Sequence, residues 1–198
     1  MQEVMQVVLD PPEPVIAERC RLGLDRHDEV WGGHYYMVPP ANNEHQRTGS
    51  ELFYLFYPLA KAAGLEYRYE SGLYDPLADP ANWCVPDQMA YRPEHGSDRG
   101  VEGHAALVIE FRSPGDDSIR KIPFYERVGV AEALIIDRDT KALRHWVRQG
   151  QSLVETDETV VSLAALPARL WRDGNTVDGN TVDANTLVVE TGAGTQRI

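Results

Sequence analysis

The chain of 198 residues carries 19 basic and 31 acidic side chains, a formal net charge of −12, and has 42% hydrophobic and 25% charged residues. These proportions are those of an ordinary globular protein and exclude extensive disorder. The length suits one domain whose core needs no disulfide, and the acidic balance argues against non-specific binding to phosphate backbones.

No apolar run reaches the ~20 residues that a membrane helix needs, which argues against a membrane partner. The first residues show neither the positive start nor the apolar stretch of a signal peptide. Cys20 and Cys84 form no disulfide or metal-binding pattern. We therefore expect a soluble, reduced, cytoplasmic protein.

The N-terminal third predicts an extension followed by a long helix. Residues 1–14 are predicted to form a flexible arm, because several closely spaced prolines prevent regular strand pairing. Residues 15–24 predict a short helix, and residues 29–38 a β-hairpin around Gly32-Gly33. An asparagine cap and apolar residues at helical spacing predict a long helix over residues 42–63.

Strands dominate the middle of the chain. The run Ala105–Ile109 is continuously apolar, as in a central strand that is buried on both faces. A helix ending near Gly129 is expected between this strand and the next. The order of elements predicts an α/β fold with a mixed central β-sheet flanked by helices. The expected strands are 66–74, 83–91, 104–111, 130–137 and 143–147, with a polar loop over 92–102.

An imperfect five-residue repeat, Asn-Thr-Val-Asp-Gly, begins at Asn175. Its two and a half copies are too few for a solenoid, which needs at least three stacked units. We expect a single domain over 15–170 and a C-terminal tail over 171–198 that contains a duplicated hairpin or terminal loop. Residues 192–198 are expected to fray.

Two carboxylates stand out beside the predicted buried strands. Glu110 directly follows the apolar run, where an unpaired charge costs several kcal/mol, so we expect it to be paired, protonated or bound to a cation. Asp87 follows Pro86 on the preceding strand, in a similar setting. Taken alone, the two acids suit a structural role as well as a catalytic one.

A lysine completes a chemically useful set. Two converging carboxylates can hold Mg²⁺ or Mn²⁺, which favours one or two carboxylates together with water and substrate phosphate. Such a cation neutralises phosphoryl oxygens and lowers the pKa of bound water. The ammonium of Lys121, in the helix after Glu110, can stabilise charge in the transition state. Asp87, Glu110 and Lys121 therefore outline a site for phosphodiester hydrolysis.

These motifs, in this order, resemble the Uma-type family of proposed bacterial restriction endonucleases, within the PD-(D/E)XK nuclease superfamily. The resemblance covers roughly residues 28–147, and only the ordered set is specific. The matching motifs are Glu29–Gly33, His45-Gln46-Arg47, Pro86-Asp87, Glu110 with Ser113-Pro114, the series Asp117, Lys121 and Tyr125, and Gly129-Val130 with the strand that ends at Asp137.

The resemblance implies a restriction-endonuclease-like core in which Asp87 and Glu110 bind Mg²⁺ or Mn²⁺ and Lys121 is catalytic. The N-terminal hairpin and helix form an extension of this core. Glu29 is implied as an accessory acid, although it also suits an ordinary hairpin surface. His45 is implied near the site, although it also suits a role in capping its helix.

Three further residues are candidate accessories. Asp117 suits either a charge at the helix start or an ion pair that holds Lys121. Tyr125 shares the face of Lys121 and suits packing. Arg112 occupies the position where the superfamily pattern has its lysine, two residues after the glutamate. It shares the side-chain direction of Glu110, so it can bind phosphate, but it stays protonated and cannot act as a base.

Gln88, in place of the usual apolar residue, is interpreted as a packing variation.

The leading hypothesis is a metal-dependent endonuclease acting on nucleic acid, with DNA as the first expected substrate. A homodimer would let two sites cut both strands of a duplex. RNA or short single strands are an alternative substrate. The acidic balance favours a rival, a catalytically silent nuclease-fold module for binding or assembly. Residues 112–148 hold eight basic and six acidic residues and include Lys121, which predicts weak, salt- and metal-dependent binding through a local groove.

Overall fold

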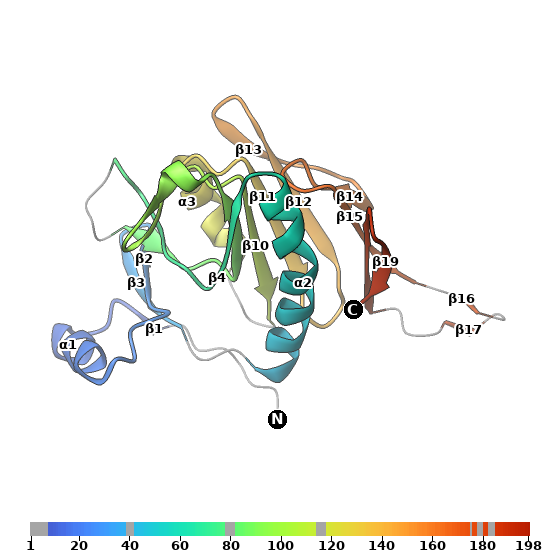
Figure 1. Ribbon diagram of the computed structural model, residues 1–198. Helices are drawn as coiled ribbons and strands as arrows, with labels where there is room; N and C mark the ends of the chain where they lie inside the picture. Colours follow the sequence, from blue (N-terminus) through green and yellow to red (C-terminus); the bar gives the residue numbers. More distant parts are fainter. Residues whose placement is uncertain are drawn as a thin grey trace.

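A mixed β-sheet lies at the centre of the molecule, with an apolar cluster on each of its faces. The computed structural model describes residues 8–38, 42–77, 82–113, 118–174, 176–177, 180–181 and 185–198. In spatial order the strands are β13 (Ser152–Glu155), β12 (Leu143–Gln149), β11 (Glu132–Asp137), β10 (Leu107–Arg112), β7 (Gln88–Tyr91) and β4 (Glu66–Tyr69). β10 and β11 are parallel and the other neighbours antiparallel. The predicted α/β class, the mixed sheet and the central position of β10 are confirmed (Figure 1).

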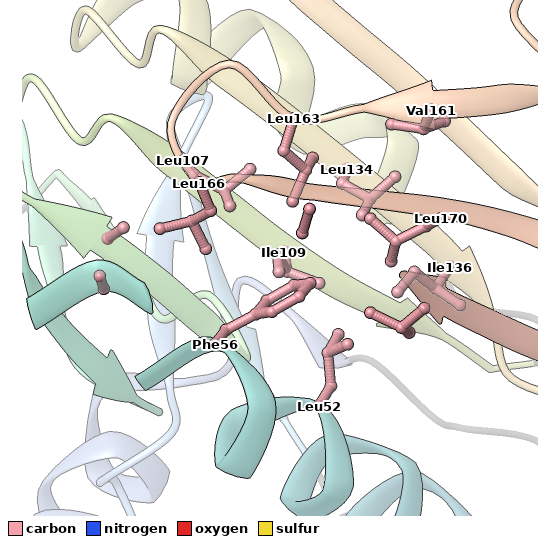
Figure 2. Packing of buried hydrophobic residues seen from close by; sticks show 14 of the residues in the cluster. Leu52, Phe56, Leu107, Ile109, Leu134, Ile136, Val161, Leu163, Leu166 and Leu170 are labelled. Carbon is pink, nitrogen blue, oxygen red and sulfur yellow. The ribbon is translucent and has the colours of Figure 1, made fainter. Parts of the chain in front are cut away.

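The first face of this central sheet is covered by the helix α2 (Asn43–Ala62) and by a C-terminal sheet. Figure 2 shows Phe56 of α2 beside Ile109 of β10, with Leu134 and Leu166 in the same cluster. Burying each such side chain contributes about 1.5–3 kcal/mol to the free energy of folding. This packing holds α2 and the C-terminal sheet against the central sheet. In spatial order the strands of the C-terminal sheet are β14 (Val160–Ser162), β15 (Ala168–Asp173), β18 (Thr186–Thr191) and β19 (Gly194–Arg197).

The C-terminal residues belong to this packed layer. Ile198 is buried and exchanges two backbone hydrogen bonds with Leu187, so the prediction that residues 192–198 fray is wrong. Leu187 and Val189 lie on one face of β18 and belong to the apolar cluster on the first face of the central sheet. Within the repeat, β16 (Thr176–Val177) pairs with β17 (Asn180–Thr181), and the intervening and following repeat residues lie outside the described ranges. The division into arm, domain and tail stays a prediction.

A buried acid joins the central sheet to the C-terminal sheet. Glu132, at the start of β11, forms a hydrogen bond of 2.7 Å with His145 Nε2 on β12. Its carboxylate also accepts hydrogen bonds of 3.1 Å from the backbone N–H groups of Ala164 and Ala165, in the loop between β14 and β15. Both side chains are almost fully buried. Glu132 thereby supplies hydrogen-bond acceptors to two backbone N–H groups of this loop.

The second face of the central sheet is covered by α3 (Ile122–Arg127), which follows the 3-10 turn η2 (Ser118–Lys121), and by an N-terminal sheet. Trp31 and Tyr36 of this sheet stack at 3.9 Å, and both contribute to the second apolar cluster. The predicted hairpin is confirmed, with φ of 61° at Gly32 and 82° at Gly33, as tight hairpin turns require. In spatial order the strands are β1 (Val8–Leu9), β3 (His34–Met37), β2 (Glu29–Trp31), β6 (Trp83–Cys84), β5 (Leu73–Tyr74), β9 (Gly100–Glu102) and β8 (Gly96–Ser97).

Two predicted strands are each divided between the central and N-terminal sheets. Residues 66–74 form β4 and β5, because Glu70, with φ of 46°, turns the chain between them. Residues 83–91 form β6 and β7, interrupted at Pro86, which has no N–H to donate to a ladder. The predicted loop 92–102 instead contains the 3-10 turn η1 (Pro93–His95), β8 and β9. The break at Pro86 places Asp87 immediately before β7, where the two sheets meet.

The N-terminal arm is partly regular. Val8 and Leu9 precede the prolines and pair with β3, which corrects the expectation that this part of the arm is unpaired. The predicted short helix, α1 (Glu13–Leu22), begins two residues earlier than expected. Proline is tolerated at its first turn because the amides there have no partner within the helix. In the described part of the chain, no helix has both the length and the apolar character to cross a membrane.

Candidate active site

Asp87 and Glu110 lie beside each other because β7 and β10 are neighbouring antiparallel strands. Ile109 faces Gln88 in the register, so Asp87 stands next to the end of β10. The backbone N–H of Phe111 donates a hydrogen bond of 2.6 Å to Asp87 Oδ2. The predicted proximity of the two acids is therefore observed.

Lys121 lies between two glutamates. Its Nζ donates hydrogen bonds to Glu29 Oε1 at 2.8 Å and to Glu110 Oε1 at 3.1 Å. The Glu29 side chain is only 2% exposed, so the alternative of an ordinary hairpin surface is wrong. Glu29 is fixed by Val85, whose N–H donates to Oε1 at 2.8 Å, and by Trp31, whose Nε1–H donates to Oε2 at 2.9 Å. The structure thus joins residues distant in sequence into one hydrogen-bonded cluster.

Tyr125 and His45 contact the two central acids. The Tyr125 hydroxyl donates a hydrogen bond to Glu110 Oε1, so this side chain does more than pack. His45 Nε2 lies 3.0 Å from Asp87 Oδ1. The side chain of Asn42 caps α2 by accepting the N–H of His45 at 3.0 Å. His45 therefore takes part in the helix cap through its backbone N–H, while its side chain contacts Asp87.

Burial and charge act together on Glu110. The pKa of its carboxyl is raised to about 8, and burial is the largest cause. The negative charges of Asp87 and Glu29 contribute to this rise, whereas the ammonium of Lys121 and the hydrogen bond from Tyr125 act against it. Burial likewise raises the pKa of Tyr125, so its hydroxyl stays a hydrogen-bond donor at neutral pH. Three neighbouring acids with one ammonium in a poorly solvated place therefore disfavour the ionised form of Glu110 in the absence of a cation.

Arg112 ends β10 at the margin of this cluster. Its side chain is 39% exposed, and Nη1 lies 4.0 Å from Asp137 Oδ2. An exposed guanidinium at this position can meet a polyanion that approaches Glu110. The other accessory candidate, Asp117, lies outside the described residues.

Sequence reasoning missed two members of the surrounding network. Trp31 holds Glu29, and its signal was a position on the same side of β2 as Glu29, two residues away. Gln88 accepts a hydrogen bond of 2.7 Å from the Tyr67 hydroxyl and donates one of 2.7 Å to the backbone oxygen of Gly49 in α2. The interpretation of Gln88 as mere packing variation is therefore incomplete, since this buried amide fastens α2 to the strand that follows Asp87.

The donor set fits a hard divalent cation held by few protein ligands. No group of three or more His, Cys, Asp or Glu side chains is arranged for a metal ion within the described ranges. Asp87 and Glu110 remain as a pair of carboxylates, and Mg²⁺ favours one or two such ligands completed by water. A cation would favour the ionised form of Glu110.

The fold is a nuclease fold, as the comparison with a solved structure shows. A crystal structure described as "a putative nuclease belonging to DUF820 from Anabaena variabilis ATCC 29413" matches with a TM-score of 0.54 and 17% identity, over 67% of this chain and 77% of that chain. The family model described as "Uma2: Putative restriction endonuclease" matches residues 18–176, and the chain belongs to this family. No curated protein matches the chain.

Proposed function

We propose that the protein is a metal-dependent endonuclease that hydrolyses phosphodiester bonds in nucleic acid, with DNA as the main substrate. The observation that carries this proposal is the position of Lys121, held between Glu29 and Glu110 beside the strand end that bears Asp87. Buried acids and a lysine in one cluster are costly to the fold, and such costs are characteristic of catalytic sites. Membership of the Uma2 family supports the same activity.

Asp87 and Glu110 are the residues that would hold Mg²⁺ or Mn²⁺. A cation bound there supplies charge neutralisation at the phosphoryl oxygens and a lowered pKa of bound water. Their carboxylates are oriented by the chain itself. His45 and the N–H of Phe111 fix Asp87, and Tyr125 fixes Glu110.

Lys121 is the residue proposed to act on the scissile phosphate. Its ammonium stabilises the negative charge that grows on the phosphate oxygens during water attack. Glu29 keeps this ammonium in place, and Glu29 is itself fixed by Trp31 and by the N–H of Val85. A group positioned before the reaction loses little entropy when it acts, which increases its effect.

Arg112 is expected to bind a phosphate of the substrate. Replacing Arg112 by alanine should weaken DNA binding and reduce the slope of log K against log salt by about one, because one phosphate contact releases about one counterion. Fluorescence anisotropy at several salt concentrations, in Ca²⁺ to prevent cleavage, measures both quantities. Arg169→Ala, an exposed arginine on the C-terminal sheet that pairs with Glu190, is the matched control and should change neither. An unchanged slope for Arg112→Ala would contradict the phosphate contact.

The proposed activity is tested by nicking of supercoiled plasmid in Mg²⁺, in Mn²⁺ and in EDTA, with single-stranded DNA and RNA as parallel substrates. Cleavage is expected only with a divalent cation and fastest on the plasmid. Asp87→Ala, purified identically, must lose the activity, since a contaminating nuclease would persist. Preferential cleavage of RNA would make RNA, instead of DNA, the main substrate of the proposed activity. Mn²⁺ binding by the wild type without any cleavage would favour the silent nuclease-fold module.

A further inference from the structure

Lys141 combines two features that cost stability. Its side chain is only 3% exposed, although lysine is almost never fully buried without partners. Its backbone has φ of 55°, a left-handed conformation that favours glycine. A residue that carries strain and a buried charge at once is informative, because both persist only when the surrounding structure requires them.

The turn that carries Lys141 is built tightly. It joins β11 to β12 and begins at Asp137, whose backbone oxygen accepts the N–H of Lys141 at 2.8 Å. Asp137 Oδ1 also accepts the N–H of Thr140 at 2.9 Å and its hydroxyl at 2.8 Å. The turn is therefore fixed to the end of the central sheet, and the direction of the lysine side chain is fixed with it.

The ammonium of Lys141 reaches the first turns of α2. Its Nζ donates hydrogen bonds of 3.0 Å to Glu44 Oε1 and of 3.0 Å to Thr48 Oγ1. Hydrogen bonds from Arg47 and from Lys141 lower the pKa of Glu44 to about 2, so this acceptor stays ionised. Glu44 and Thr48 flank His45 along the helix. Lys141 thus ties the segment of α2 that carries His45 to the central sheet.

His45 connects the first turns of α2 to Asp87. Its Nε2 lies 3.0 Å from Asp87 Oδ1, and its ring packs edge-on against Phe111 at 5.4 Å. One turn further along, α2 approaches the sheet so closely that a Cβ at Gly49 would lie 3.3 Å from the Phe111 ring. Little room remains for His45 to adjust independently of the helix. The position of α2 on the sheet therefore determines where the imidazole contacts Asp87.

We propose that Lys141 is a positioning residue of the active site, which orients the Asp87 carboxylate by fixing the first turn of α2 and with it His45. The inference rests on the proposed function in one respect, that Asp87 holds the divalent cation. The contact between His45 and Asp87 can be measured without any metal.

The test compares Lys141→Met, which keeps the apolar stem, with Lys141→Gly, which also relieves the backbone strain. We expect both variants to bind Mn²⁺ about tenfold more weakly than the wild type by isothermal titration calorimetry, the lower end of the effect of losing a group that orients a metal ligand. Thermal stability should fall in Lys141→Met and be largely restored in Lys141→Gly. Mn²⁺ affinity that recovers together with stability in Lys141→Gly would overturn the proposal.

A spectroscopic readout separates this inference from the proposed function. The imidazole ¹⁵N chemical shifts of His45 report its hydrogen bond to Asp87 and should change in both Lys141 variants in the absence of metal. In a His45→Ala background, Lys141→Met should cause no further loss of Mn²⁺ affinity, since the two residues act through one path. A wild type that binds no Mn²⁺ contradicts the proposed function, whereas unchanged His45 shifts in both variants overturn the role of Lys141.

Discussion

Replacing Lys121 by methionine is expected to lower the rate of DNA cleavage by about two to three orders of magnitude, the usual effect of removing one preorganised stabilising group. The substitution removes the ammonium that lies 2.8 Å from Glu29 and 3.1 Å from Glu110. Mn²⁺ binding should be retained or tightened, because the lysine no longer competes for the Glu110 carboxylate. Plasmid nicking under single-turnover conditions measures the first effect, and calorimetry with Mn²⁺ measures the second.

Asp87→Asn is the matched comparison for Lys121→Met. This variant should lose both cleavage and Mn²⁺ binding, so the two variants separate the chemical role of the lysine from the metal-holding role of the acid. Circular dichroism establishes that each variant is folded. Full cleavage by folded Lys121→Met would exclude Lys121 as the catalytic lysine.

Glu110→Gln is expected to stabilise the metal-free protein while abolishing Mn²⁺ binding. The carboxyl has its ordinary pKa of 4.5 in the unfolded chain and a pKa of about 8 in the folded one. Between these values the folded state holds a proton that the unfolded state has lost, so stability falls as the pH rises and stays low above the folded pKa. Each pKa unit corresponds to about 1.4 kcal/mol, which makes the penalty several kcal/mol at pH 8. Glutamine does not carry this penalty.

Thermal unfolding in EDTA at several pH values measures whether Glu110→Gln is more stable than the wild type and how this difference depends on pH. The difference in Tm between Glu110→Gln and the wild type should be small near pH 4.5 and should grow toward pH 8. Glu132→Gln is the control at another buried acid. This variant should be less stable than the wild type, because the Glu132 carboxylate accepts the N–H groups of Ala164 and Ala165. A Glu110→Gln variant that is less stable than the wild type at pH 8 would contradict the electrostatic account of the site.

The acid pair could be predicted because each acid has a local signal in the sequence, whereas Lys121 was identified by its place after Glu110 and by the family resemblance. Glu110 interrupts an apolar strand, and Asp87 follows a proline that ends another. The contacts of Glu29, His45 and Tyr125 depend on how the hairpin, α2 and α3 pack onto the central sheet, which no local pattern specifies. The proximity of Glu29 and His45 to the site was available only through the family resemblance, whereas the helical spacing placed Tyr125 on the face of Lys121. The hydrogen bonds of Gln88 could not be predicted, since its partners Tyr67 and Gly49 are distant in sequence.

The central strands and long helices were predictable from periodicity, whereas the breaks and the C-terminal sheet were not. Residues 66–74 keep an alternating pattern across Glu70, so the left-handed turn there is invisible in the pattern of side chains. In the C-terminal sheet, β18 was hidden by the repeat at Asn175, whose composition is that of a loop. Leu187, the last residue of the repeat, and Val189, just after it, carried the strand signal that the repeat obscured.

The site is assembled from two parts of the chain that are distant in sequence and belong to different sheets. Glu110 and Lys121 belong to one local unit, the connection from β10 through η2 and α3 to β11. Glu29 comes from the N-terminal sheet, and Asp87 lies at the junction between that sheet and β7. With that sheet undocked, Lys121 would keep Glu110 but lose Glu29. The proposed nuclease activity therefore depends on the docking of the N-terminal sheet.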